Sequence, residues 1–104
     1  MSATAAFGEE RNLIDGRLVP SSSGATFENV NPATEEVIGV VADGTRADME
    51  AAIAAARRAF DHTSWSEDPA LRARCLRQLH AACVEALEEL RRVVVSEAGS
   101  PVLL

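Results

Sequence analysis

The sequence predicts an α+β fold, in which a β-hairpin and two further short strands precede two long helices. Three observations indicate it. An Asp-Gly pair stands between two apolar pairs near residue 15, which is typical of a hairpin turn. The run Val37–Val41 is apolar almost without alternation, as in a buried strand. From Thr45 onward, apolar residues recur at helical spacing.

The first part of the chain predicts a hairpin over residues 12–19. Asp15-Gly16 suits the two-residue type I′ turn, because both of its central residues need a positive φ. Pro20 and the Ser-Ser-Ser-Gly run that follows end the hairpin and form a loop. The residues before the hairpin are small and acidic, so we expect residues 1–11 to form a disordered tail and residues 12–104 the folded part.

Two more strands are predicted after that loop. Residues 26–30 combine a phenylalanine with β-branched residues at both ends. Asn31-Pro32 then turns the chain, because proline fixes its own φ and disfavours helix in the residue before it. The apolar run Val37–Val41 should be covered on both faces, and Gly39 within it indicates a bulge or a close backbone approach.

A helix is predicted to begin after Thr45. Thr45 as N-cap and Asp48 three residues later resemble a capping box, with aspartate in the place usually held by glutamate or glutamine. One apolar face follows at helical spacing. That face consists of Met49, Ile53, Ala56 and Phe60.

The second predicted helix begins at Asp68-Pro69, with aspartate as N-cap and proline at the first helical position. Gly99 is placed to end it, and Pro101 prevents its return. About thirty residues make a helix of roughly 45 Å, which implies a larger body for it to lie across. Its apolar stripe consists of Leu76, Leu79, Cys83, Leu87, Leu90 and Val94.

Composition limits what this chain can be. It has 104 residues and an apolar share of 47%, but 19 of its residues are alanine and only four are aromatic. Such a core is thin, so we expect the apolar faces to meet further protein. Ten arginines, no lysine and sixteen acids give a net charge of −6, which argues against nucleic-acid binding. We find no targeting segment or membrane-spanning run, and so expect a cytoplasmic location and no membrane partner.

Few side chains are candidates for chemistry. Cys75 and Cys83 lie eight residues apart on one predicted helix, about 12 Å between Cα atoms, which is too far for a disulfide. Cys83 falls within the apolar stripe, as a small hydrophobe would. Cys75 stands beside arginines, which could favour a thiolate, but a structural role is preferred for it too. His62 and His80 have no ligand or partner at metal-binding spacing.

Arg72 and Trp65 are interpreted as structural residues, and the sequence has no glycine-rich motif for binding phosphate. Arg72 falls on the apolar face of its helix and needs a carboxylate or carbonyl partner; an ion pair is preferred over substrate binding. Trp65 is interpreted as a plug that seals the loop against the helices. The glycines form no phosphate-binding pattern, so dinucleotide binding by these residues alone is unsupported.

Five short motifs follow one another along the chain: Asn31-Pro32-Ala33-Thr34, Ala59-Phe60, Trp65, Arg72 with Leu76, and Glu97-Ala98-Gly99-Ser100-Pro101. Together with the predicted strands and helices, their order resembles the N-terminal region of the aldehyde dehydrogenase superfamily over about residues 12–101. Two positions depart from the family pattern: Glu35 stands where a turn glycine is usual, and Ser100 replaces a lysine. If residue 35 has a positive φ, its backbone is strained, because it is not a glycine.

The resemblance implies a parent enzyme with an α/β aldehyde dehydrogenase fold and a Rossmann-like cofactor domain. That oxidoreductase would use NAD or NADP to oxidise an aldehyde to a carboxylate, and would be a homo-oligomer. The family's thiol nucleophile, glutamate base, asparagine oxyanion donor and nicotinamide-binding units all occur later in the sequence. We therefore expect no catalytic or cofactor-binding residue here, no bound cofactor and no activity in this chain alone. Its partner would be the remainder of the enzyme chain.

The family resemblance also implies one metal site. Family members often hold a structural cation through backbone carbonyls just before the Asn-Pro turn, which correspond here to Asn29 and Val30. The remaining ligands would come from later sequence, so the site would be incomplete in this chain.

Two other functional classes stay open from the sequence. The chain could be a stand-alone α+β interaction or structural module, whose apolar stripes meet a partner chain or a second copy. It could also be a degenerate gene remnant without catalysis. A continuation of the reading frame into a Glu-Leu-Gly-Gly-like stretch and a later Gly-x-x-Cys favours the enzyme. A stop codon with a cooperatively folding monomer favours the module, and poor solubility favours the remnant.

Overall fold

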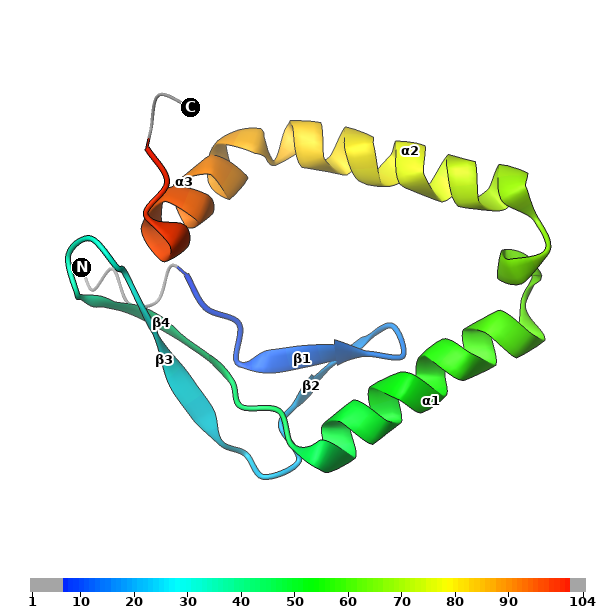
Figure 1. The fold of residues 1–104 in the computed structure, drawn as a ribbon, viewed down its shortest axis with the longest axis horizontal. Helices are drawn as coiled ribbons and strands as arrows, with labels where there is room; N and C mark the ends of the chain where they lie inside the picture. Colours follow the sequence, from blue (N-terminus) through cyan, green and yellow to red (C-terminus); the bar gives the residue numbers. More distant parts are fainter. Residues whose placement is uncertain (1–6, 102–104) are drawn as a thin grey trace.

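The computed structural model describes residues 7–101, which form four strands, a single-turn 3₁₀ helix and three α-helices. They are arranged around an opening, with the strands and α1 on one side and α2 and α3 on the other (Figure 1). The elements in order are β1 (Arg11–Ile14), β2 (Arg17–Pro20), β3 (Thr26–Val30), β4 (Val37–Ala42), α1 (Arg46–His62), η2 (Ser64–Ser66), α2 (Pro69–Glu85) and α3 (Leu87–Ala98).

β1 and β2 form the predicted hairpin. They pair antiparallel, from Arg11 opposite Pro20 to Ile14 opposite Arg17. Asp15 and Gly16 at the turn have φ of 54° and 73°. Both values are positive, as a type I′ turn requires.

β3 and β4 form a second antiparallel pair that contains a bulge. Asn29 lies opposite Gly39, but Val30 lies opposite Val37, so Ile38 is the extra residue on β4. The turn between the strands is closed by the predicted Asn-Pro unit. The Asn31 side chain accepts hydrogen bonds from the backbone N–H groups of Ala33 and Thr34, at 2.8 and 3.2 Å.

The segment before β1 lies against β4, which corrects part of the expected tail. Residues 1–6 fall outside the described residues, but Phe7 donates its N–H to the Ile38 carbonyl, and Glu9 accepts from Ala42 N–H at 3.2 Å. Arg11 already belongs to β1. A Cβ on Gly39 would lie 2.7 Å from the Phe7 carbonyl carbon, so the close backbone approach predicted at this glycine is confirmed.

α1 begins as predicted. The Thr45 side chain accepts from Asp48 N–H at 3.1 Å, and the Asp48 carboxylate accepts from Thr45 N–H at 2.8 Å. This reciprocal pair is a capping box. Asp48 also accepts from Ser21 Oγ and from Ser22 N–H, so the β2–β3 loop is tied to the start of the helix.

The long second helix is two helices, and the single helix expected after Pro69 is wrong. α2 ends at Glu85 and α3 begins at Leu87, with Ala86 at φ −93° and ψ 13° between them. Figure 1 shows that α3 changes direction there and turns back toward β3 and β4. Alanine is a strong helix former, so local sequence gives no reason for the break. α3 ends at Gly99, with φ 69°, as the sequence predicts.

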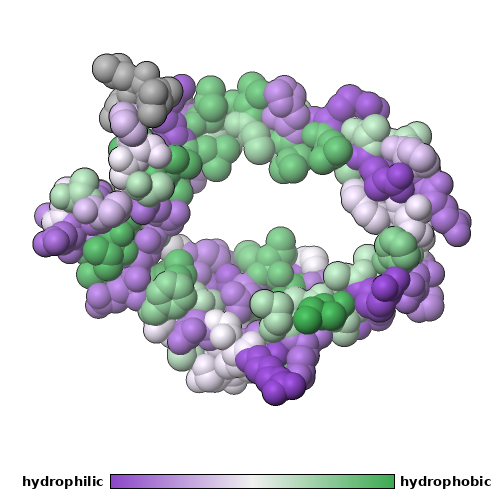
Figure 2. Space-filling model, in the orientation of Figure 1, coloured by the Kyte–Doolittle hydropathy of each residue, from purple (hydrophilic) through white to green (hydrophobic). Residues whose placement is uncertain are grey.

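The core is very small. Within residues 7–101, Ile38 is the one large apolar side chain that is buried, at 4% exposure, and it lies in the β4 bulge. The radius of gyration is 16.9 Å, whereas a compact domain of this length would have about 13 Å. The elements therefore form an open frame, and the space-filling view in Figure 2 shows the opening that it surrounds.

Candidate functional site

Asn29 and Val30, the residues assigned to a cation by family resemblance, lie at the end of β3 beside the β4 bulge. The Asn29 side-chain amide donates two hydrogen bonds, to the Phe7 carbonyl at 2.7 Å and to Glu97 Oε1 at 2.6 Å. This position therefore gathers the N-terminal segment, β3 and the end of α3.

The oxygen atoms at this junction are hard ligands of the kind that alkali and alkaline-earth cations prefer. Glu97 adds a carboxylate, which accepts a hydrogen bond from the side-chain amide of Asn29. Among residues 7–101 there is no group of three or more histidine, cysteine or acidic side chains that could hold a metal ion. The oxygen donors at this junction therefore have the chemistry of hard-cation ligands, and the described residues do not complete a coordination shell.

Sequence reasoning did not find two parts of this junction. Glu97 was noted only as part of the closing Glu-Ala-Gly-Ser-Pro motif, and Phe7 was assigned to the tail. The sequence did contain one signal for the contact between the Phe7 segment and β4. Gly8 and Gly39 are the two glycines at which an added Cβ atom would clash with the backbone of the other segment. Matching glycines of this kind mark places where two backbones meet.

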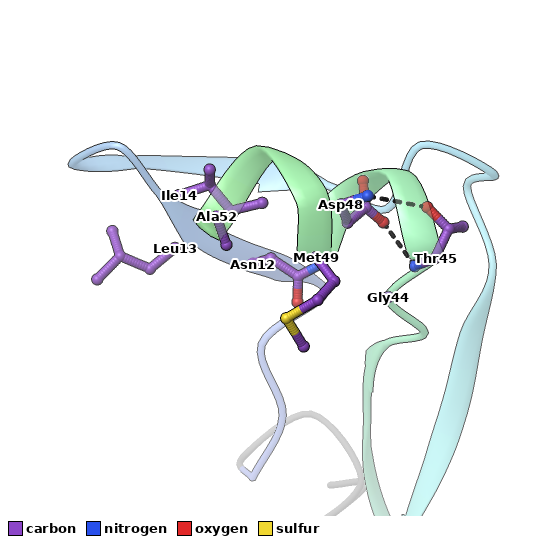
Figure 3. A pocket seen from close by; sticks show the side chains of 8 residues that line it. All are labelled: Asn12, Leu13, Ile14, Gly44, Thr45, Asp48, Met49 and Ala52. Atoms are coloured by element: carbon purple, nitrogen blue, oxygen red, sulfur yellow. Dashed lines mark hydrogen bonds between the residues drawn. The ribbon is translucent and has the colours of Figure 1, made fainter. Parts of the chain in front are cut away.

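A shallow pocket of about 260 Å³ lies between β1 and the start of α1, and Figure 3 shows the side chains that line it. Asp48 is its one acidic residue, and hydrogen bonds from Thr45 and Ser22 N–H lower the pKa of that carboxyl below its ordinary value. Since these bonds hold it as a charged cap, Asp48 is a structural carboxylate and a poor general base. The lining residues are Asn12, Leu13, Ile14, Gly44, Thr45, Asp48, Met49 and Ala52.

The cysteines and histidines are not brought together. Cys75 is half-buried and Cys83 is exposed. Both histidines are exposed. In the described part of the chain, no hydrogen bond links either thiol to a histidine or a carboxylate, so the arrangement of an activated nucleophile is not met there.

Arg72 finds a carbonyl partner in place of the preferred ion pair. Its guanidinium donates to the Trp65 carbonyl at 2.6 Å, which ties α2 to η2. Trp65 itself remains 40% exposed. The seal expected of it is therefore only partial in this structure.

The apolar stripes predicted from the sequence are exposed. On α1, Met49, Ile53 and Phe60 keep 62%, 60% and 52% of their surface accessible. On α2, Leu76 and Leu79 keep 64% and 59%. These values are high for a helix face that the sequence marks as buried.

Comparison with known proteins accounts for this open frame. The family model described as "Aldehyde dehydrogenase family" matches residues 18–103. The chain belongs to this family. It is 43% identical over 90 residues to malonate-semialdehyde dehydrogenase 1 of Geobacillus thermodenitrificans. The aligned residues make up 86% of this chain and 18% of that relative.

Solved structures of aldehyde dehydrogenases have the same fold over this region. The NAD-dependent enzyme of Sinorhizobium meliloti superposes with a TM-score of 0.85 at 30% identity, over 96% of this chain and 20% of that one. Betaine aldehyde dehydrogenase of Staphylococcus aureus, solved with NAD⁺, superposes with a TM-score of 0.83 at 37% identity, over 89% of this chain and 19% of that one. The two small sheets and three helices thus match the N-terminal part of an aldehyde dehydrogenase fold, and the chain spans about a fifth of its relatives' length.

Proposed function

We propose that this chain is the N-terminal scaffold segment of an NAD- or NADP-dependent aldehyde dehydrogenase, and that it is inactive on its own. The supporting observation is its exposed surface. The chain exposes 7949 Å², whereas a compact protein of 11.0 kDa would expose about 5,600 Å². The excess is about 2,300 Å², which is the size of a large interface.

The parent reaction would oxidise an aldehyde to a carboxylate. A cysteine thiolate adds to the aldehyde carbonyl, the resulting thiohemiacetal loses a hydride to give a thioester, and water then releases the acid. The nicotinamide supplies the hydride acceptor when it is bound. In this proposal the segment contributes position, through the ties at Asn29 and Asp48, and the later sequence contributes the nucleophile.

The relatives support the nicotinamide in this proposal, because the S. meliloti enzyme is named as NAD-dependent and the S. aureus enzyme was solved with NAD⁺. We extend the proposal to a homo-oligomeric, cytoplasmic parent, without nucleic-acid or membrane partners. Among the described residues no helix has the length and apolar character that crossing a bilayer needs.

The structural cation belongs to the same proposal. The carbonyls of Asn29 and Val30 would supply two ligands, and the Glu97 carboxylate, which accepts from the Asn29 side-chain amide at 2.6 Å, is the candidate for a third. A bound cation there would screen the carboxylate and tie α3 to β3. The rest of the coordination shell would come from the remainder of the enzyme.

Two assays test the proposed function. The purified chain, incubated with aldehydes and NAD or NADP, should produce no NADH or NADPH. A fusion in which this chain replaces the N-terminal fifth of the G. thermodenitrificans enzyme should oxidise malonate semialdehyde, the substrate in that relative's name. Turnover by the chain alone, or a soluble but inactive fusion, would contradict the proposal.

A further inference from the structure

The sequence contains two Asp-Gly pairs, Asp15-Gly16 and Asp43-Gly44. In such a pair the backbone nitrogen of the glycine can attack the Cγ atom of the aspartate, because glycine has no Cβ to obstruct the approach. Both aspartates are exposed, so access to solvent favours neither pair. The structure holds the two backbones differently, and this difference decides which pair can react.

The reaction of an Asp-Gly pair is a condensation followed by a hydrolysis. The bond from the glycine nitrogen to Cγ forms, the hydroxyl of the protonated carboxyl leaves with the amide proton as water, and a five-membered imide results. Water then opens the imide at one of its two carbonyls. Attack at Cγ restores aspartate, whereas attack at the original main-chain carbonyl gives isoaspartate, whose main chain runs through Cβ and Cγ. The sequence of steps consumes no oxidant, reductant or cofactor.

Closure of the imide ring fixes one backbone angle of the aspartate. The glycine nitrogen and the aspartate Cβ must be nearly eclipsed about the Cα–C bond. For an L residue this means a ψ of about −120°, the value that a type II′ turn has at its first central residue, together with a φ of about +60°. The imide therefore fits a hairpin turn whose first central residue already has a positive φ.

Asp15 already has that φ. It is the first central residue of the β1–β2 turn, with φ 54°, and Gly16 follows with φ 73°. Type I′ and type II′ turns both join two-residue hairpins and differ by a rotation of the central peptide. Gly16 accepts either sign of φ, and among residues 7–101 no hydrogen bond outside the strand ladders engages the backbone of Asp15 or Gly16. The peptide between them can therefore rotate while β1 and β2 stay paired.

The Asp15 side chain is not locked away from Gly16. Its carboxylate lies 3.3 Å from the Arg58 guanidinium on α1, and the two side chains are 65% and 57% accessible. An ion pair this exposed contributes little. The carboxyl group can therefore leave Arg58 and reach the glycine nitrogen.

Asp43-Gly44, in the loop before α1, is held in place. The Asp43 N–H donates to the Ala25 carbonyl at 2.9 Å. The Asp43 carbonyl accepts from the hydroxyl of Ser21, which is buried, at 2.6 Å. Rotation of the Asp43–Gly44 peptide would break the bond to Ser21, and Asp43 is not among the described residues with a positive φ. This pair therefore resists ring closure.

We propose that Asp15-Gly16 is a modification site at which the folded chain converts Asp15 to isoaspartate through an imide that fits the turn, while Asp43-Gly44 stays intact. The inference does not depend on the proposed function. Isoaspartate lengthens the main chain of the two-residue loop by one carbon atom, and so disrupts the turn that sets the register of β1 and β2. It also frees an α-carboxylate, the group that protein-isoaspartate methyltransferases esterify with the methyl group of S-adenosylmethionine.

The experiment incubates the purified chain at mildly acidic pH, once folded and once in urea, and circular dichroism verifies the folded sample. Trypsin separates the two pairs, because cleavage after arginine gives peptides 12–17 and 18–46. Reversed-phase chromatography resolves the isomers of each peptide, and methyl transfer from S-adenosylmethionine by a protein-isoaspartate methyltransferase identifies isoaspartate. In the folded chain we expect residue 15 to isomerise about tenfold faster than residue 43, where hydrogen bonds must first break. In urea the two rates should be similar.

Two variants test the geometry. Asp15→Asn keeps a pair that suits a type I′ turn, and its amide forms the same imide with loss of ammonia, so isoaspartate should appear at residue 15 faster than in the parent chain. Ser21→Ala removes the hydrogen bond to the Asp43 carbonyl. It should raise the rate at residue 43 and leave the rate at residue 15 unchanged.

Four results would overturn the inference. Equal rates at the two pairs in the folded parent chain would show that the turn confers no preference. A preference for residue 15 that persists in urea would assign it to the neighbouring sequence. Absence of isoaspartate at residue 15 in both the folded parent chain and Asp15→Asn, over a time in which the urea sample reacts, would show that the turn prevents ring closure. An unchanged rate at residue 43 in a folded Ser21→Ala chain would refute the account of its protection.

Discussion

The side-chain amide of Asn29 on β3 donates a 2.6 Å hydrogen bond to the carboxylate of Glu97 at the end of α3, 68 residues away in sequence. The same amide donates to the Phe7 carbonyl at 2.7 Å. One side chain thus joins the first described residue, a strand and the last helix. This link closes the frame on the side opposite the η2 connection (Figure 1).

The first prediction concerns this link. Asn29→Ala should lower the free energy of unfolding by about 1–2 kcal/mol, because it removes two hydrogen bonds, one of them to a carboxylate, at a partly exposed site. Urea unfolding followed by circular dichroism measures the change. Glu28→Ala, at an exposed neighbour on β3, is the control and should have little effect. Equal stability of Asn29→Ala and the parent chain would show that α3 does not depend on this link.

The second prediction concerns pH. Hydrogen bonds from Thr45 and Ser22 N–H hold the pKa of Asp48 below its ordinary value of 3.8. A carboxyl whose pKa is lowered by folding contributes stability that is present above the unfolded pKa and is lost as the pH falls through the folded pKa. The start of α1 should therefore loosen only below about pH 3.8.

Asp48→Asn isolates this contribution from that of the other acids. The variant should be less stable than the parent chain at pH 6, and the difference should shrink as the pH falls from 4 to 2. Helical circular dichroism of both proteins in urea across this range measures it. A difference that is constant with pH would mean that the ionisation of Asp48 does not contribute to stability.

The third prediction concerns the contact between the N-terminal segment and β4. Gly39→Ala would place a Cβ 2.7 Å from the Phe7 carbonyl, so the segment must move away, at a cost of roughly 1–3 kcal/mol. The amide protons of Phe7 and Ala42, which bond across this contact, should then exchange faster with solvent. Gly44→Ala is the matched control, since its Cβ would meet Asn12 at an ordinary 3.7 Å. Unchanged exchange at Ala42 would refute the steric account.

Local signals were sufficient for most elements of the fold. Asp15-Gly16, Thr45 with Asp48, Asp68-Pro69 and Gly99 each act within a few residues, and the structure has a turn, cap or helix end at each of them. The hydrogen bonds and backbone conformations that form these turns and caps involve only neighbouring residues, so the sequence alone predicts them.

The missed features all depend on distant parts of the chain. Ala86 carries no breaking signal, and the bend there brings α3 toward β3, where Glu97 meets Asn29. The docking of Phe7 and Gly8 on β4 likewise needs a partner thirty residues away. The apolar stripes were found correctly, but sequence periodicity does not tell what covers them, and in this structure they stay exposed.

The last prediction concerns strain in the Asn-Pro turn. Glu35 has φ of 62°, in the left-handed region, and its N–H donates to the Asn31 carbonyl at 2.8 Å. A non-glycine residue there costs roughly 1–2 kcal/mol, part of which glycine returns through the greater freedom of the unfolded chain. Glu35→Gly should therefore raise the free energy of unfolding by about 0.5–1 kcal/mol, as measured by urea unfolding.

Glu36 is the neighbouring control, because it is equally exposed but is not among the described residues with positive φ. Glu36→Gly should lower the free energy of unfolding, since it adds freedom to the unfolded chain and relieves no strain. Opposite signs at two adjacent glutamates would attribute the gain at residue 35 to its backbone conformation. The same sign at both would attribute it to the loss of a negative charge from a chain whose net charge is −6.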